Sequence, residues 1–169
     1  METITHEHIT ERVKNQFGDG LVDAFETYGM LTLVIKPEIN LEVLKFLKDE
    51  SDLGFGFLKD ECGIHYPFNK DEELGVIYLL HNLRANVQVR VKAFFPSDKP
   101  VIRSATSLWA SANWMERETY DFFGIKFESH PDLRRILNVD DMDYFPMLKQ
   151  YPLEDGTRED KDDTMFGRG

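Results

Sequence analysis

The sequence predicts an α+β fold, with a mixed or antiparallel sheet, helices packed on one face and an extended C-terminal arm. Helical and strand-like patterns follow one another in the order helix, strands, helix, strands, helix. The clearest strand pattern alternates apolar and polar residues, which is typical of a sheet with one partly solvated face. Regular periodicity ends after Leu137. We therefore expect an α+β domain over residues 1–137 and an arm over residues 138–169.

The first elements are a helix and a strand pair. Residues 5–17 carry apolar side chains at helical spacing, behind a threonine, Thr3 or Thr5, that is expected to cap the helix. A Gly-Asp-Gly sequence ends this pattern. Residues 21–36 then predict two strands that meet at a turn on Gly29.

A second helix and three further strands follow. Residues 39–51 predict an amphipathic helix, for which Asn40 is a plausible cap. Strands are expected over residues 55–67, 74–83 and 86–95, with a hairpin loop between the last two. In the last strand one face is expected to carry Val87, Val89, Val91 and Ala93.

The last clear helical pattern covers residues 104–124. Gly124 stands at the stop position, and the start offers three capping candidates, Ser104, Thr106 and Ser107. Trp109 and Trp114 are five residues apart and therefore lie on different faces of this helix. We expect one of them in the core and the other at an interface.

The predicted arm is acidic. Residues 140–163 contain nine acidic and three basic residues, together with two prolines and a glycine. Alone, such a segment would be poorly ordered. It also holds apolar residues with few neighbours of their own to pack on, namely Tyr144, Phe145, Met147, Leu148, Tyr151 and Leu153. We therefore expect the arm to lie across another protein and to be disordered before assembly.

Composition excludes several classes of function. A formal net charge of −11 argues against binding to nucleic acid or to anionic lipid headgroups. The single cysteine, Cys62, forms no intrachain disulfide, zinc knuckle or iron–sulfur site, and we expect it to be a small buried apolar residue. The N-terminus does not resemble a signal peptide, and the apolar runs are too short to span a bilayer. We expect a cytoplasmic protein whose contact with a membrane goes through a partner.

The acidic residues of the last helix form no metal-binding pattern. Glu116 and Glu118 lie about 200° apart around a helix and cannot share an ion. Glu118 and Asp121 lie about 60° apart, but the Glu-x-x-His spacing of di-metal bundles is absent. Arg117 and Asp121 have the i,i+4 spacing of a salt bridge. We therefore expect no metal site here.

His130, which precedes Pro131, is the remaining catalytic candidate. No serine or cysteine nucleophile is marked near it, so a packed or capping histidine is the simpler interpretation. An unrelated small enzyme with Glu118 and His130 as an acid–base pair stays open as an alternative. No phosphate-binding motif is present, so NAD, flavin and ATP sites are not expected. The adjacent Arg134 and Arg135 suit salt bridges within the chain or, if both turn outward, contacts with a partner.

A long motif points to a family. Residues 112–137, ANWMERETYDFFGIKFESHPDLRRIL, closely resemble the signature of the C subunit, or 30 kDa subunit, family of proton-pumping NADH:quinone oxidoreductase (respiratory complex I). The signature residues include Trp114, Glu116, Arg117, Glu118, Asp121, Gly124, His130, Pro131, Arg134 and Arg135. The arm resembles the family at Lys149, Tyr151 and Pro152. It departs from the family pattern at Phe145, Leu148 and Gln150, and His65 replaces a common aspartate upstream.

The resemblance implies a structural and assembly subunit of the peripheral arm, without catalytic residues or a cofactor of its own. FMN, iron–sulfur clusters and quinone would belong to the complex, and the D and B subunits would be the chief partners. The implied location is the cytoplasmic side of the bacterial inner membrane, reached only through the complex. The signature charges are then expected to pair partly within the chain and partly across a subunit boundary. The equivalent subunit of a related membrane-bound hydrogenase complex is the alternative.

Overall fold

The computed structural model describes residues 4–152 and forms one five-stranded mixed sheet in the order β1-β2-β5-β4-β3. Its strands are β1 (Leu21–Thr27), β2 (Met30–Ile35), β3 (Phe57–His65), β4 (Leu74–Asn82) and β5 (Val87–Phe95). Neighbouring strands are antiparallel except β2 and β5, which are parallel. The helices are α1 (His6–Phe17), α2 (Asn40–Asp49) and α3 (Ala112–Phe123), and two 3₁₀ turns cover Gly18–Gly20 and Pro37–Ile39.

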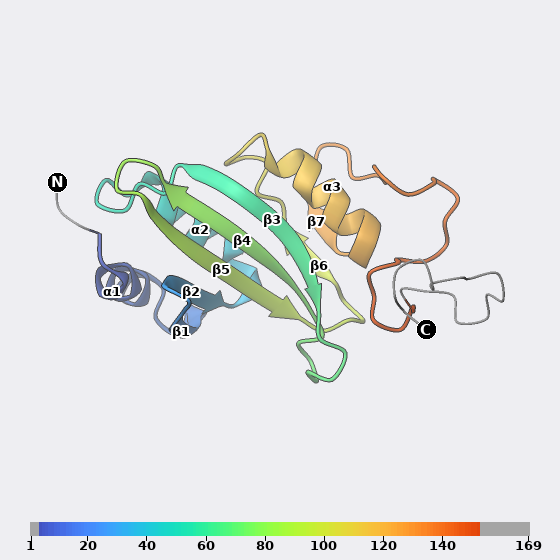
Figure 1. Ribbon diagram of the computed structural model, residues 1–169, viewed down its shortest axis with the longest axis horizontal. Coiled ribbons are helices and arrows are strands. Elements are labelled where there is room, and N and C mark those ends of the chain that lie inside the picture. The colour runs from blue at the N-terminus through green and yellow to red at the C-terminus, as the bar shows by residue number, and fades with distance from the viewer. Residues whose placement is uncertain (1–3, 153–169) are drawn as a thin grey trace, which may run out of the picture.

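The helices cover one face of the sheet, and α2 lies behind the sheet in the view of Figure 1. The register brings buried side chains into line across this face, for example Leu33, Val91, Tyr78 and Glu61. The next row points to the other face and is half-buried or exposed, namely Val34, Lys92, Ile77 and Cys62. The predicted α+β fold with a partly solvated second face is therefore confirmed.

The N-terminal elements form as the sequence predicts. Thr5 caps α1, and its hydroxyl accepts a hydrogen bond from the His8 backbone N at 3.2 Å. The β1–β2 hairpin turns at Tyr28 and Gly29, which both have positive φ. Two such residues are what a tight hairpin turn requires.

Two helix starts differ from the prediction. Asn40 does not cap α2: the 3₁₀ turn before it directs its amide into the core, where it donates to the carbonyl of Arg103 at 2.8 Å. The third helix begins at residue 112 rather than 104. Two short strands, β6 (Val101–Arg103) and β7 (Lys126–Glu128), pair in parallel as a second sheet. Ser104 follows β6, and its backbone N–H donates to the backbone carbonyl of Glu128. These strands have three residues each, too few for a visible alternation.

Cys62 also differs from the prediction, because it is exposed. It lies on the partly solvated face of β3, opposite Ile77 of β4. Its neighbour on the covered face is Glu61. Alternation along a strand therefore exposes the thiol and buries the carboxyl, the reverse of what the polarity of these two residues suggests.

Helix α3 packs along β3, a strand at the edge of the sheet. At one end the indole N–H of Trp109, just before the helix, donates to the carbonyl of Gly56 at 2.9 Å. At the other end the ring of Phe123 lies over Gly63, where a Cβ would come within 2.5 Å of the ring. The helix thus covers one face of this strand along most of its length.

The packing of α3 on β3 predicts the effect of a single methyl group. Gly63→Ala should lower the free energy of unfolding by about 1–3 kcal/mol, because Phe123 must move away from the sheet. Gly56→Ala is the matched control, since an added Cβ at Gly56 has no neighbour within 4 Å. Urea unfolding of the two variants and the wild type measures the difference. Equal stability of the two variants would contradict this close packing.

Candidate functional site

The signature segment forms α3, the turn at Gly124, β7 and a loop that returns along the helix. Gly124 has a left-handed backbone (φ 75°) and ends α3, as predicted. After β7 the chain folds back, so that residues 134–138 lie beside the last turns of α3. Residues far apart in the signature are therefore in contact.

The carboxylate of Asp121 holds this returning loop. One oxygen accepts the backbone N–H groups of Ile136, Leu137 and Asn138 at 3.1, 2.8 and 2.9 Å. The other accepts from the guanidinium of Arg135 at 2.7 Å and from the side chain of Asn138 at 3.1 Å. Burial alone would raise the pKa of Asp121, but these hydrogen bonds outweigh it and lower the pKa well below its usual range.

Arg135 extends this network into the arm. Its side chain is 10% exposed and, besides Asp121, it donates to the carbonyls of Met142 and Tyr144 at 2.7 and 3.0 Å. Its guanidinium also lies over the ring of Phe145, 5.1 Å from the centroid. One arginine thus joins α3, the returning loop and the start of the arm.

Arg117 does not pair with Asp121, so the predicted i,i+4 salt bridge is wrong. Its guanidinium donates to the carbonyls of Arg134 and Arg135 at 3.2 and 3.0 Å, and it lies over the ring of Trp114 at 5.3 Å. The physical reason is that Asp121 is already saturated by the loop. Arg117 holds the other side of the same loop through its carbonyl groups.

Glu116 points into the core. Its carboxylate accepts the backbone N–H of Ala105 at 2.6 Å, and the residue is fully buried. Burial raises its pKa to about 7, although hydrogen bonds from Ser104 and Ala105 oppose the shift. Its position ties α3 to the turns that precede the helix.

His130 is a packed histidine, as predicted. Its Nε2 lies 3.1 Å from the carbonyl of Asn113, and its Nδ1 accepts the backbone N–H of Asp132 at 3.0 Å. The two contacts select the tautomer with the proton on Nε2. Pro131 is exposed in the turn that follows. Neither ring nitrogen bonds to Glu118, so the acid–base pair considered from the sequence is not formed.

The signature charges therefore divide into two groups. Asp121 and Arg135 pair with each other, and Glu116 is buried in the core, so these three are not left over for pairing across a subunit boundary. Glu118 is exposed on the helix surface. The interpretation in which Arg134 and Arg135 turn outward together is wrong, because only Arg134 does so.

We call three of the exposed signature side chains the α3 patch: Trp114, Glu118 and Arg134. Trp114 is 61% exposed, whereas Trp109 is buried, so one tryptophan is in the core and the other on the surface, as expected. The expected reason is wrong, because Trp109 precedes α3 and is not on another face of that helix. The side chain of Arg134 is 69% exposed and pairs with Asp132 at 2.8 Å. Arg117 touches both Trp114 and the backbone of Arg134, which makes the patch continuous.

The described part of the arm, residues 138–152, lies against its own domain. The ring of Phe145 packs on Tyr120 of α3 at 5.9 Å and against Gly124. Leu148 packs on the edge of the hydrophobic core. The apolar residues of the arm were expected to have few neighbours of their own, but Phe145 and Leu148 find theirs in the domain. Residues 153–169, including Leu153, lie outside the described part of the chain.

Three of the four residues that depart from the family pattern take part in these contacts, namely Phe145, Leu148 and His65. His65, at the end of β3, accepts the backbone N–H of Lys149 at 2.9 Å through its Nδ1. Tyr151, which matches the family, packs against Tyr144 with ring centroids 4.9 Å apart and the ring planes tilted by 45°, and Pro152 is exposed. Nothing in the sequence indicated that His65, far upstream of the arm, would contact it.

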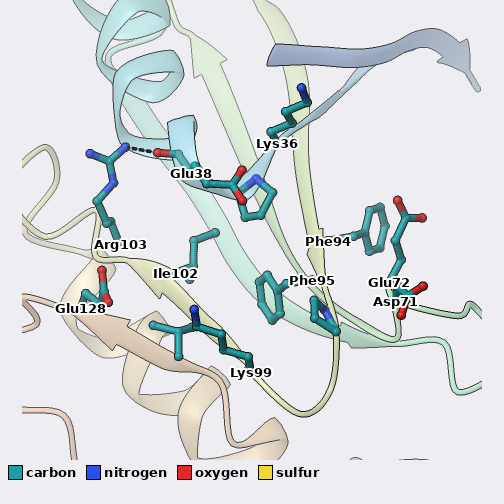
Figure 2. Close-up of a pocket in the computed structure, with 13 residues that line it drawn as sticks. Lys36, Glu38, Asp71, Glu72, Phe94, Phe95, Lys99, Ile102, Arg103 and Glu128 are labelled. Carbon is teal, nitrogen blue, oxygen red and sulfur yellow. Dashed lines mark hydrogen bonds between the residues drawn. The ribbon is translucent and has the colours of Figure 1, made fainter. Parts of the chain in front are cut away.

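A groove lies away from the α3 patch, where β5 ends beside β6 (Figure 2). Phe95 and Ile102 lie between the charged side chains that line it. Charges of both signs are present: Lys36, Lys99 and Arg103 against Glu38, Asp71, Glu72 and Glu128. Arg103 is engaged by Glu42 and by the carbonyl of Glu38. This mixture defines no preference for a ligand of one charge.

Within residues 4–152 no three histidine, cysteine or carboxylate side chains come together as a set of metal ligands. No helix in that part of the chain has the length and apolar character for crossing a bilayer. The strongest polar interactions instead hold a loop and an arm onto a helix. These features define a small α+β domain whose signature residues organise its own surface.

Comparison with known proteins assigns the family. Residues 33–157 match the family model described as respiratory-chain NADH dehydrogenase, 30 Kd subunit, and the chain belongs to this family. It is 43% identical to the C subunit of NADH-quinone oxidoreductase from Citrifermentans bemidjiense, over 88% of this chain and 90% of that protein. It is 37% identical to the corresponding protein of Thiobacillus denitrificans, over 89% and 78%. The resemblance stated from the sequence is confirmed.

Solved structures agree. A trypsin-resistant fragment of Nqo5 is 34% identical and superposes with a TM-score of 0.63, over 74% of this chain and 99% of the fragment. A chain of an archaeal membrane-bound sulfane sulfur reductase superposes with a TM-score of 0.73, over 87% of this chain and 85% of that chain. At 20% identity the second likeness shows a shared fold.

The two adjacent arginines predict opposite outcomes. Arg135→Ala should lower the free energy of unfolding by about 3–5 kcal/mol, because it leaves the buried carboxylate of Asp121 without its cation. Arg134→Ala, on the exposed side, should change it by less than about 0.5 kcal/mol. Urea unfolding of both variants measures the difference. Similar losses in the two variants would contradict the division of roles.

Proposed function

We propose that the chain is a non-redox structural and assembly subunit in the peripheral arm of a proton-translocating NADH:quinone oxidoreductase. That enzyme passes electrons from NADH through FMN and iron–sulfur clusters to a quinone. Membership of the family supports the proposal. The contacts that the signature charges make within the chain also support it. Asp121, Arg135 and Arg117 hold a loop and an arm in place, which is the work of a scaffold.

The α3 patch is the proposed contact with neighbouring subunits, chiefly the D and B subunits. Trp114 and Glu118 are four residues apart on α3 and so share one face of the helix. Exposed tryptophan and arginine side chains are the residue types that most often anchor protein interfaces. Arg134 and Glu118 add charges of opposite sign, which would orient a partner rather than attract one non-specifically. Arg117, beneath Trp114, holds the ring in position.

The arm is the second proposed contact. Tyr144, Met147 and Tyr151 keep between 36% and 41% of their surface exposed although the arm is packed on α3. A neighbouring protein that covers these side chains would bury them from the other side. Lys149 and Pro152 lie in the same stretch. In this proposal the contact also includes residues 153–169, which lie outside the described part of the chain.

The proposed location is the cytoplasmic side of the bacterial inner membrane, with membrane contact only through the complex. The FMN and iron–sulfur clusters are assigned to other subunits, because a single exposed cysteine does not supply the ligands of a cluster. A hydrogenase-type complex is less supported, since the relatives from Citrifermentans bemidjiense and Thiobacillus denitrificans belong to NADH-quinone oxidoreductases.

The α3 patch predicts a defect in assembly without a defect in folding. Trp114→Ala should reduce recovery of neighbouring subunits with the tagged chain by tenfold or more, since loss of an interface anchor costs about 2 kcal/mol or more. Thermal unfolding of the isolated variant should match the wild type, because the ring is mostly exposed. Pull-down from detergent-solubilised membranes, mass spectrometry and NADH-to-quinone activity are the measurements.

Tyr28→Ala is the control for this experiment. Tyr28 is fully exposed at the hairpin next to β1, the sheet edge opposite to the one that α3 covers. The Tyr28→Ala variant should leave the recovery of neighbouring subunits and the NADH-to-quinone activity unchanged. Equal recovery of partners with Trp114→Ala and the wild type would refute the assignment of the α3 patch. Recovery of the wild-type chain with the large protein of a nickel–iron hydrogenase would transfer the proposed function to that class of complex.

A further inference from the structure

Glu61 is a buried carboxyl that the proposed scaffold role does not use. It is 2% exposed, and among the described residues neither of its oxygens has a hydrogen-bond partner. A β-bulge explains its position. The register of β3 against β4 shifts between Leu58 and Asp60, so that Leu58 faces Leu80 and Glu61 faces Tyr78. Both therefore point to the covered face, although they are three residues apart.

A second carboxyl reaches the same region from the helix layer. Helix α3 runs along β3, with Trp109 against Gly56 at one end and Phe123 against Gly63 at the other. Glu116 is midway between Trp109 and Phe123, and Glu61 lies between the two glycines. Both carboxyls are buried, and they come from the two layers that pack together, the sheet and α3.

One of the two carboxyl oxygens of Glu116 has no hydrogen-bond partner among the described residues. Oε1 accepts the N–H of Ala105, but Oε2 has no hydrogen bond within residues 4–152. The nearest basic group is Nε2 of His130, 4.0 Å away, whose contact is with the carbonyl of Asn113. That nitrogen is not positioned to neutralise the carboxyl. The adjacent Arg117 is also turned away, toward the carbonyls of residues 134 and 135.

The other groups around Glu61 give no compensating charge. Tyr78 of β4 and Asn40 of α2 are buried and bonded to each other at 3.2 Å, and the Oδ1 of Asn40 is a further unpaired acceptor. Asp60 and Cys62 flank Glu61 on β3. Burial raises the pKa of Glu61 well above its ordinary value, and the charges of Glu116 and Asp60 raise it further.

We propose that Glu61 and Glu116 form a buried proton-binding site that holds at least one proton at neutral pH. Two ionised carboxylates without a cation would each carry the full cost of burial and would also repel one another. A proton removes one charge and converts one carboxyl oxygen into a donor, among oxygens of Glu61, Glu116 and Asn40 that have no hydrogen bond within residues 4–152. Because the two side chains come from β3 and α3, the bound proton stabilises the contact between the sheet and the helix.

The site links stability to pH with a definite sign. An acid whose pKa is raised on folding binds its proton more tightly in the folded than in the unfolded state. The folded state is then favoured at low pH. Stability is lost as pH rises from the ordinary pKa of 4.5 through the raised pKa of each carboxyl, which is about 7 for Glu116 and well above the ordinary value for Glu61. In this pH range, each proton that is released on unfolding makes the ratio of folded to unfolded protein fall by up to about tenfold per pH unit.

The test is urea unfolding of the full chain from about pH 5 to about pH 9. Glu61→Gln keeps the shape of the side chain and removes the titration, so its stability should fall less steeply with pH than that of the wild type. Glu61→Leu should be more stable than the wild type at the alkaline end. Glu11→Gln, at an exposed position on α1, is the control and should keep the wild-type slope.

Infrared spectroscopy of the wild type gives a readout that needs no variant to fold. A protonated carboxyl band should be present at neutral pH, should be lost on alkaline titration, and should weaken in Glu61→Gln. If the stability of the wild type and of Glu61→Gln falls equally steeply with pH, the proposal is overturned. So would the absence of a protonated carboxyl band in the folded wild type at neutral pH.

Discussion

The saturation of one carboxylate, that of Asp121, determines how the signature half of the molecule is arranged. Three consecutive backbone N–H groups and one guanidinium converge on it, and these groups belong to a loop that follows β7. A buried carboxylate is stable only when its acceptor sites are filled, so the loop and the helix must come together. The same guanidinium then fixes the arm through two carbonyl groups. The position of the arm thus depends on a residue of the helix.

The elements with regular local patterns could be predicted from the sequence. The capped first helix, the hairpin at Gly29, the strands of the sheet and the stop at Gly124 are set by neighbours a few residues apart. The start of α3 could not be predicted in the same way. Ser104 and Thr106 are good capping residues, but the pairing of β6 with β7 keeps the chain extended up to that point. A contact with residues more than twenty positions away decided between two locally acceptable structures.

The candidate site shows the same limit. The residue types of the signature identified the family, yet their partners could not be read from spacing. Arg117 and Asp121 have the spacing of a helical ion pair, but each has better partners in the loop. The exposure of Cys62 and the burial of Glu61 follow from one inserted residue in β3. A β-bulge has no reliable sequence signature, so a pattern of alternation counted across it assigns the wrong faces.

The parallel pairing of β2 with β5 has a consequence for synthesis of the chain. Leu31 of the N-terminal hairpin pairs with Val89, and all of α2, β3 and β4 lies between them in sequence. A two-stranded hairpin has little stability alone. During translation β1 and β2 must therefore wait until β5 has left the ribosome before the sheet can close. Until then the hairpin edge stays open to pairing with other chains, so a nascent chain at this stage is exposed to aggregation.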